Sequence, residues 1–202
     1  MKLRLTSFWL AGMCIIVFIL QALTSTEYFI LDRSLMLVQP YRIISALFAH
    51  SDIVHLLSNL FALCLFGLIL EGRIGPSRVL YLFLVAGIII NIFSPYDRSL
   101  GASGAIYAII GTLIVLRPRM IIWVEGLPMP MLLAGFVWFF QDFFGIFIPD
   151  NVGNIAHLSG LFIGISYGFR LRKQFADRPK KRKHDPLTER QLDEYEKHHC
   201  LR

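Results

Sequence analysis

The chain alternates between long apolar stretches and short segments that carry nearly all of its charge. A helix that crosses a bilayer needs about 20 mostly apolar residues. Six windows come close to that length with little or no charge, and only Asp142 interrupts the fifth: Leu5–Thr26, Ile53–Leu70, Val79–Tyr96, Ser99–Leu116, Gly126–Ile148 and Asn151–Phe169. The pattern predicts an all-α, polytopic membrane protein with six transmembrane helices.

Composition supports the membrane assignment. Of the 202 residues, 55% are hydrophobic and only 17% are charged, and the mean hydropathy is +0.60. Soluble domains average about 25% charged residues. The first window is too long for a cleaved signal peptide and lacks a convincing small-residue cleavage site, so we expect it to remain as a helix. The three cysteines, Cys14, Cys64 and Cys200, form no framework that predicts a structural disulfide.

The distribution of Lys and Arg predicts the orientation. With six spans both termini share one side, and 17 of the 20 basic residues fall on that side. Only Arg33, Arg42 and Arg98 fall on the other. Because basic residues favour the cytoplasmic side, we expect both termini in the cytoplasm and spans two, four and six to begin at the outer surface of the cell membrane.

The last segment of the chain differs in kind. Residues 1–170 are predicted to form the membrane domain, and residues 171–202 a basic cytoplasmic tail; the basic stretch RLRKQFADRPKKRK begins at Arg170. Each basic residue near anionic lipid headgroups contributes about 1 kcal/mol to membrane binding. Membrane lipids are therefore the expected partner of the tail, whereas nucleic-acid binding is the less favoured alternative beside a membrane helix.

Four polar side chains lie near the starts of the even-numbered spans. His55 and Asn59 share one face of span two, Ser103 begins span four, and His157 lies in span six. All three starts are on the outer side, so these residues are expected at similar depth, where they can converge. Ionisable groups within membrane spans are rare and usually functional. A cluster of this kind predicts a water-filled cavity that opens outward.

Span four is predicted to be short and central. From Ser103 to Arg117 it has 15 residues, or about 22 Å of helix, which is less than the roughly 30 Å of the hydrocarbon core. Gly101 permits a sharp turn before it. Small residues let membrane helices pack backbone to backbone, and they follow helical spacing in span four and span six: Gly104, Ala108, Gly111, Gly160 and Gly164.

At these positions the sequence resembles the rhomboid family of intramembrane serine proteases. The matching motifs are GASG at 101–104, HLLSN at 55–59 and AHLSG at 156–160, in the order and spacing of the family's GxSG, HxxxN and AHxxG elements. Tyr107 and the EGRIGPSRVLY stretch after span two also agree. One departure is Tyr41, which stands before Arg42 where the family has tryptophan. The resemblance covers roughly residues 5–170.

The resemblance implies a rhomboid-type six-helix bundle and an intramembrane endopeptidase without metal or other cofactor. Ser103 would be the nucleophile and His157 the general base and acid, in a dyad without a third carboxylate. Tyr107 would stack on the histidine. The oxyanion would be held by His55 and Asn59 with the backbone N–H groups of Ser103 and Ala102, and Gly101, Gly104 and Gly160 would support the site. Substrates would be transmembrane proteins, cut in or near the outer end of a helix.

Other classes fit the sequence less well. A membrane metalloprotease would need an HExxH-like pair, which is missing, and on a helix His50 and His55 would lie about 140° apart. A non-proteolytic rhomboid-like binding or quality-control protein would be expected to lack the serine or the histidine. A transporter that uses the polar cluster is the remaining alternative.

Two features are left open by the sequence. Asp142, late in span five, either reaches the outer interface or lies beside the path of substrate entry. The first outer loop is unusually apolar, and we expect it to lie partly in the outer leaflet. The substrate, the residue preference at the cleavage site and the oligomeric state do not follow from the sequence.

Overall fold

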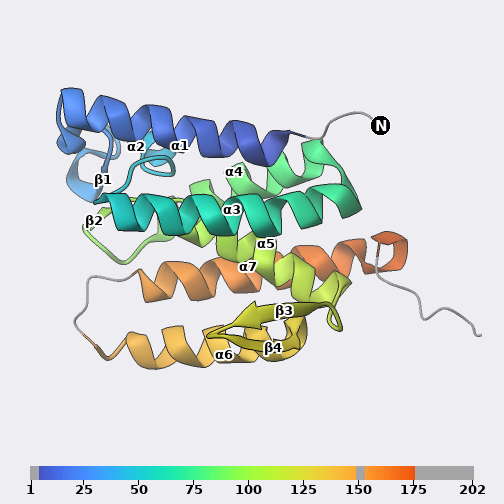
Figure 1. Cartoon of the computed structure of the whole chain (residues 1–202). Coiled ribbons are helices and arrows are strands. Elements are labelled where there is room, and N and C mark those ends of the chain that lie inside the picture. The colour runs from blue at the N-terminus through green and yellow to red at the C-terminus, as the bar shows by residue number, and fades with distance from the viewer. Residues whose placement is uncertain (1–4, 149–152, 176–202) are drawn as a thin grey trace, which may run out of the picture.

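Long helices run side by side in the computed structural model, which describes residues 5–148 and 153–175 (Figure 1). The described residues form helices at each of the six apolar windows, so the predicted helical bundle is confirmed. Residues 176–202, most of the predicted tail, lie outside the described residues. The helices are α1 (Thr6–Leu23), α2 (Arg42–Ser45), α3 (Ile53–Ile74), α4 (Pro76–Phe93), α5 (Ser103–Leu116), α6 (Met131–Gly145) and α7 (Asn154–Phe175).

Three of the described helices, α1, α3 and α4, are long and apolar enough to cross a membrane. The apolar helices α5 and α6 are shorter, with 14 and 15 residues. The 22 residues of α7 include polar Asn154 and His157 and end in a basic segment. Six membrane crossings therefore remain a prediction. The short helix expected to begin at Ser103 is confirmed as α5.

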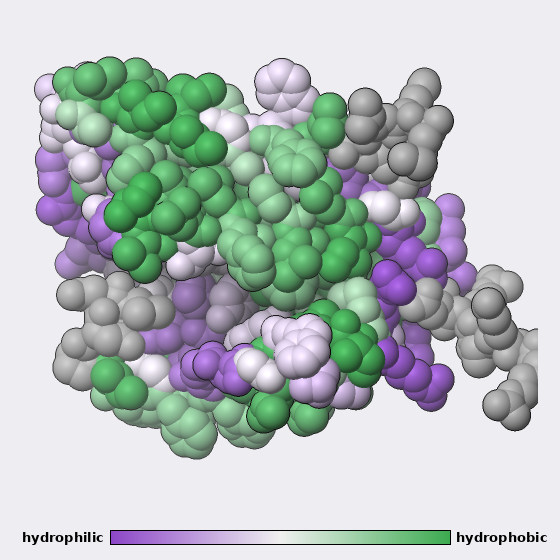
Figure 2. All heavy atoms as spheres, in the orientation of Figure 1, coloured by the Kyte–Doolittle hydropathy of each residue, from purple (hydrophilic) through white to green (hydrophobic). Residues whose placement is uncertain are grey.

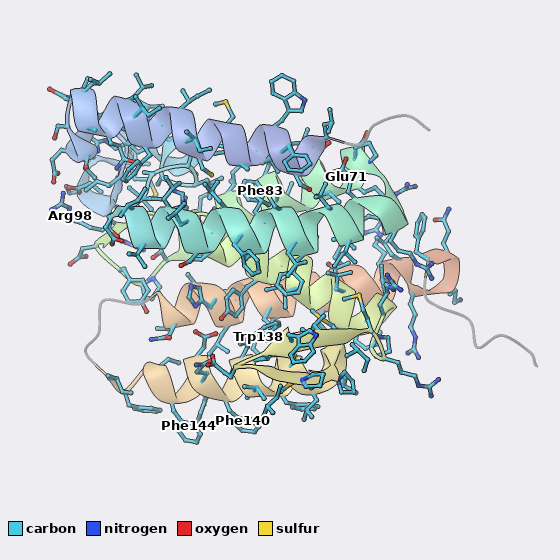
Figure 3. All side chains as sticks on the ribbon, in the orientation of Figure 1. Glu71, Phe83, Arg98, Trp138, Phe140 and Phe144 are labelled. Carbon is cyan, nitrogen blue, oxygen red and sulfur yellow. The ribbon has the colours of Figure 1, made fainter. Side chains whose placement is uncertain are left out.

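Apolar side chains cover the outside of the bundle. Figure 2 shows hydrophobic residues over α1 and α3 and along the outer edge of α6, with hydrophilic residues toward the two ends of the helices and in the lower middle, where a short segment lies in front of α6. Trp9 of α1 and Phe61 of α3 are 74% and 70% exposed. Phe140 and Phe144 of α6 point away from the bundle (Figure 3). Such a belt is the arrangement expected of a protein whose solvent is lipid.

Helix α5 forms the centre of the bundle. Eleven of its 14 residues are buried, because α3, α4, α6 and α7 all pack against it. The buried side chains are small or aliphatic, which suits close helix packing. The residue that begins this central helix is Ser103, so the position of α5 fixes the position of the serine.

The predicted small-residue contact between α5 and α7 is confirmed. A Cβ atom added to Gly160 would lie 2.0 Å from the carbonyl oxygen of Gly104, and one added to Gly164 would lie 2.0 Å from that of Ala108. At Gly111 the added atom would lie 2.3 Å from the carbonyl oxygen of Leu161. Only glycine permits these backbones to approach so closely.

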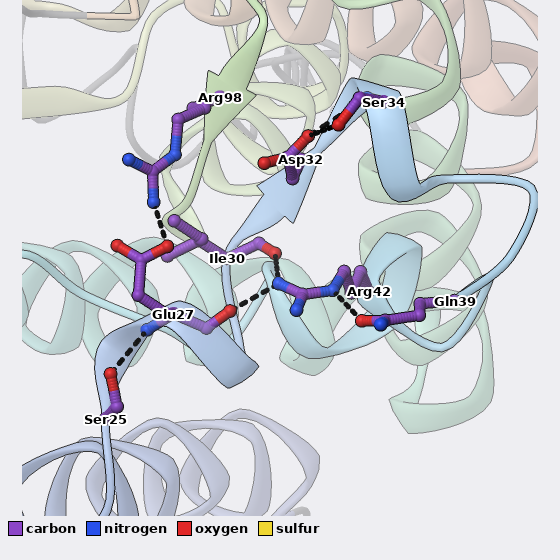
Figure 4. A network of polar contacts seen from close by, with 8 residues as sticks. All are labelled: Ser25, Glu27, Ile30, Asp32, Ser34, Gln39, Arg42 and Arg98. Carbon is purple, nitrogen blue, oxygen red and sulfur yellow. Dashed lines mark hydrogen bonds and ion pairs between the residues drawn. The ribbon is translucent and has the colours of Figure 1, made fainter.

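The first outer loop folds around the buried side chain of Arg42 (Figure 4). The guanidinium donates to the carbonyl oxygens of Glu27 and Ile30, the latter at 2.9 Å, and to the Gln39 side chain at 2.6 Å. Glu27 also forms an ion pair with Arg98. The loop therefore depends on an arginine, as the resemblance implies, while Tyr41 in the tryptophan position is 51% exposed.

Short strands connect this loop to the segment before α5. Strand β1 (Leu31–Asp32) lies between the 3₁₀ turns η1 (Thr26–Tyr28) and η2 (Arg33–Leu35) and pairs antiparallel with β2 (Arg98–Ser99). The N–H group of Gly101 donates to the carbonyl oxygen of Ala46 at 2.8 Å. The loop thus holds the turn that leads into Ser103.

A β-hairpin between α5 and α6 corrects the all-α prediction. The fifth window was expected to be helical from Gly126, but β3 (Ile121–Val124) pairs with β4 (Leu127–Pro130), and α6 begins only at Met131. Pro128 and Pro130 disfavour a helix interior. Glu125 and Gly126 both have positive φ, 50° and 80°, as in the two-residue type I′ turns that favour hairpins.

A buried carboxylate joins the end of α3 to the start of α1. Glu71, fully buried near the end of α3, accepts hydrogen bonds from the backbone N–H groups of Thr6 and Ser7 and from the Ser7 hydroxyl, at 3.2, 3.0 and 3.0 Å (Figure 3). A carboxylate at a helix N-terminus satisfies donors that have no partner within the helix. Glu71 thereby fixes the start of α1 against α3.

We predict that Gly164→Ala lowers the free energy of unfolding by about 1–3 kcal/mol, because the new methyl group overlaps the carbonyl of Ala108 and forces α5 and α7 apart. Gly12→Ala in α1 is the matched control, since its Cβ would meet no atom within 4 Å. That variant should leave the unfolding free energy unchanged or raise it by up to about 1 kcal/mol. Denaturant titration in detergent micelles measures both, and equal stability of the two variants would contradict the packing model.

Candidate active site

Ser103 is the first residue of α5, immediately after the N-cap residue Ala102. Gly101 precedes them with φ of +116°, a backbone conformation that residues other than glycine rarely adopt. The first N–H groups of a helix have no intrahelical partner and carry the positive end of the helix dipole. The turn therefore presents the Ser103 hydroxyl beside backbone donors.

His157 lies in the first turn of α7, and the close α5–α7 contact brings it to Ser103. Its Nε2 atom is 2.9 Å from the Ser103 Oγ atom. The ring of Tyr107, one turn after the serine, stacks on the imidazole with centroids 4.4 Å apart and planes 7° from parallel. The expected serine–histidine contact and tyrosine stacking are thus both present in the geometry, while their catalytic roles remain predictions.

Asp142 lies on the other side of the imidazole. Its Oδ1 atom is 2.8 Å from His157 Nδ1, and the side chains of His157 and Asp142 are only 13% and 7% exposed. A carboxylate therefore lies beside the imidazole, where the resemblance implied none, and its burial excludes the reading that places Asp142 at the outer interface. Asp142 comes from the neighbouring helix α6, and the sequence alone does not place that helix beside His157.

His55 and Asn59 lie on the first turns of α3, facing the turn before Ser103. The N-cap residue Asp52 accepts from the backbone N–H of His55 at 2.8 Å. A Cβ atom on Gly101 would lie 3.1 Å from His55 Nε2, so the ring packs directly against the backbone of the turn. The Asn59 side-chain amide donates to the carbonyl oxygen of His55 at 2.9 Å, which leaves its second N–H available.

A cavity of about 1000 Å³ brings these groups together. Its wall includes residues from α3, α4, α5 and α7 and from the end of α6. Among the predicted site residues, those that line the cavity are His55, Asn59, Gly101, Ser103, Gly104, Tyr107 and His157. Ala102 is buried behind the turn, and Gly160 lies against the Gly104 carbonyl in the α5–α7 contact.

A second histidine near the cavity was not singled out as a site residue. His50 is 1% exposed, and its ring packs edge-on against His55 with centroids 5.0 Å apart. Burial, and secondarily the neighbouring His55, lowers the pKa of His50 to about 4, so it is neutral at neutral pH. His50 precedes α3, so the 140° separation that a shared helix would give His50 and His55 does not apply. Among the described residues, no group of three or more metal-binding side chains gathers.

The region that contains the predicted site residues matches a known family. The family model for the Rhomboid domain matches residues 37–174. The chain is 33% identical over 143 residues to the "Rhomboid protease GlpG" of Haemophilus influenzae, which covers 66% of this chain and 72% of that protein. It is 30% identical over 140 residues to the "RHOMBOID-like protein 6, mitochondrial" of Arabidopsis thaliana, covering 67% of this chain and 45% of that protein.

A third relative is the "Rhomboid protease GlpG" of Yersinia pseudotuberculosis, 30% identical over 139 residues, covering 65% of this chain and 48% of that protein. The chain thus spans about half the length of two of these three relatives and most of the other. The family model itself extends over more than half of the chain, from the first outer loop to the end of α7. With the serine, the histidine and the packed α5–α7 pair all within the matched region, this chain belongs to the rhomboid family.

Proposed function

We propose that this protein is an intramembrane serine endopeptidase that hydrolyses a peptide bond in or near the outer end of a transmembrane helix of another protein. The observation that carries the proposal is the 2.9 Å contact between Ser103 Oγ and His157 Nε2 beside a cavity of about 1000 Å³. Membership of a family whose relatives include proteins named as proteases supports it.

In the first half of the reaction, Ser103 Oγ attacks the carbonyl carbon of the scissile peptide bond and its proton passes to His157 Nε2. The carbonyl oxygen becomes an oxyanion. When the tetrahedral intermediate collapses, the C–N bond breaks, and His157 Nε2 gives its proton to the leaving amine. The products of this step are the released amine fragment and an ester between the acyl fragment and Ser103.

In the second half, water from the cavity attacks the ester carbonyl and gives a proton to His157 Nε2. The second tetrahedral intermediate collapses with loss of Ser103 Oγ, which takes that proton back. The polar lining of the cavity supports the entry of water to a site otherwise surrounded by apolar helices.

The oxyanion formed in each step needs donors that are already in place. We assign this role to the Asn59 side chain, the His55 imidazole and the backbone N–H groups of Ser103 and Ala102. Preorganised donors in a site of low dielectric constant stabilise developing charge far better than they would in water. The start of α5 adds the positive end of its helix dipole.

A non-proteolytic rhomboid-like protein and a transporter are the alternatives. Neither requires a serine hydroxyl hydrogen-bonded to an imidazole, which is the observation that favours hydrolysis. A serine-directed fluorophosphonate distinguishes the classes, since covalent labelling of Ser103 requires an activated nucleophile.

We expect Ser103→Ala and His157→Ala each to abolish cleavage of a transmembrane substrate, with the double variant no slower than either single one. Residues that act as one unit are non-additive, and loss of a serine-protease nucleophile or base can cost about 10⁶ in rate. The measurement is turnover of tagged transmembrane segments by purified protein. Substantial residual cleavage by Ser103→Ala would rule out the serine mechanism.

We expect Asn59→Ala to reduce turnover by about 10²–10³, the usual cost of losing one oxyanion donor, while Ser103 still reacts with the fluorophosphonate. His55→Ala should behave similarly and should not recover on addition of zinc. Turnover and labelling are measured on the same preparations. If neither substitution changed turnover, the oxyanion assignment would be wrong while the roles of Ser103 and His157 would stand.

The proposed location is the cell membrane, with both termini in the cytoplasm and the cavity opening to the outer side. Reporter fusions after Arg119 and at Arg202 should read cytoplasmic, because most Lys and Arg residues are predicted to lie on that side of the membrane. Fusions near Asp97 should read external. A cytoplasmic signal at Asp97 would overturn this orientation.

A further inference from the structure

Asp142 is an acidic residue in the apolar helix α6, where it stands in the sequence FFQDFFG. Its side chain is 7% exposed, and its neighbours on the helix are phenylalanines that face outward, such as Phe140 and Phe144 (Figure 3). A buried charge is costly unless it is paired, and ionisable groups inside membrane proteins are retained chiefly where they have a function. The steps assigned to Ser103 and His157 do not involve Asp142.

The contacts of Asp142 lead to the imidazole of His157. Oδ1 is 2.8 Å from Nδ1, the ring nitrogen that faces away from Ser103. The ring of Tyr107 stacks on the imidazole and covers one of its faces. Oδ2 is buried and has no hydrogen-bond partner among the described residues. His157 is therefore the group against which the charge of Asp142 is placed.

We propose that Asp142 is the third member of the catalytic arrangement, a positioning residue that acts on Ser103 through His157. This inference rests on the proposed function. An ionised Asp142 accepts a hydrogen bond from the Nδ1–H group of neutral His157, so the lone pair of the imidazole lies on Nε2, opposite the Ser103 hydroxyl. The carboxylate thus selects the one tautomer that can take the serine proton.

The same carboxylate acts again once the proton has moved. Transfer of the proton from Ser103 Oγ to Nε2 turns the imidazole into an imidazolium, and its positive charge appears directly beside Asp142. Charges attract more strongly in a buried site than in water. Because the carboxylate is already in place, this stabilisation requires no reorganisation during the reaction. No proton needs to pass to Asp142 itself.

A purely structural role is the competing explanation, because Asp142 also joins α6 to α7. Both explanations allow some loss of stability when the residue is replaced. They differ in the chemical step, since a structural role changes stability or substrate binding without specifically slowing the attack by Ser103. The decisive measurements are therefore kcat and KM separately, together with the rate of fluorophosphonate labelling.

The test compares Asp142→Asn with wild type in the full-length protein. The amide can donate to Nδ1 and so favour the wrong tautomer, which in a soluble serine protease costs about 10⁴ in kcat. We expect kcat to fall by about 10²–10⁴ with KM nearly unchanged, and the labelling rate of Ser103 to fall in parallel. Asp142→Glu, which keeps the carboxylate, should recover part of both rates.

Thr112→Val is the matched control. Thr112 is a fully buried polar residue of α5 whose hydroxyl donates to the carbonyl oxygens of Ala108 and Gly164 at 2.9 and 3.0 Å, away from the cavity. Its replacement removes a buried polar contact between helices without touching the imidazole. Its kcat and labelling rate should stay at the wild-type level even if its thermal midpoint falls.

The result separates the two proposals. Wild-type kcat and labelling in Asp142→Asn, or a loss no larger than that of Thr112→Val at equal stability, would overturn the role of Asp142 and leave the serine mechanism intact. A lower melting midpoint with normal kcat would equally assign Asp142 to structure alone. Failure of the proposed function itself would appear instead as turnover by Ser103→Ala.

Discussion

The site depends on how closely the backbones of α5 and α7 approach. Ser103 belongs to one helix and His157 to the other, 54 residues later in the chain, yet their side chains must meet at 2.9 Å. Glycines at the crossing make that distance possible. A Cβ atom on Gly160, about one turn after His157, would overlap the carbonyl of Gly104, the residue after Ser103. The close packing of α5 on α7 therefore positions the imidazole beside the serine hydroxyl.

The outer loop imposes the second constraint on Ser103. Arg42 closes the loop by donating to backbone carbonyls inside it, and the carbonyl of Ala46 at the end of that loop accepts from Gly101. Glycine adopts the φ of +116° seen at Gly101 without a side-chain clash, and the hydrogen bond to Ala46 fixes this one conformation among those open to it. The loop thus does more than cover the bundle, because it fixes the turn that aims the hydroxyl and the backbone donors beside it.

Much of this arrangement follows from the sequence, because the decisive signals are local or repeat at helical spacing. Four polar residues at the starts of even-numbered spans predicted the cavity, and the glycine stripes predicted the α5–α7 contact. The β3–β4 hairpin was missed because the apolar window concealed two prolines and a Glu125–Gly126 turn. Asp142 was missed for a different reason: its partner lies on another helix, and only the packing of α6 on α7 shows which face it occupies.

Burial explains why the polar groups of the site form one connected set. In an apolar bundle each unpaired donor, acceptor or charge costs free energy that water would otherwise offset. Here Ser103 faces His157, His157 faces Asp142, and Tyr107 stacks on the imidazole. Each group satisfies the next, and the chain begins at the cavity where water can enter. Under the proposed mechanism, a positive charge on the imidazole would lie directly beside the Asp142 carboxylate, because Oδ1 already contacts Nδ1. In the proposed reaction this contact stabilises the protonated histidine that forms when Ser103 attacks, with the carboxylate already in place.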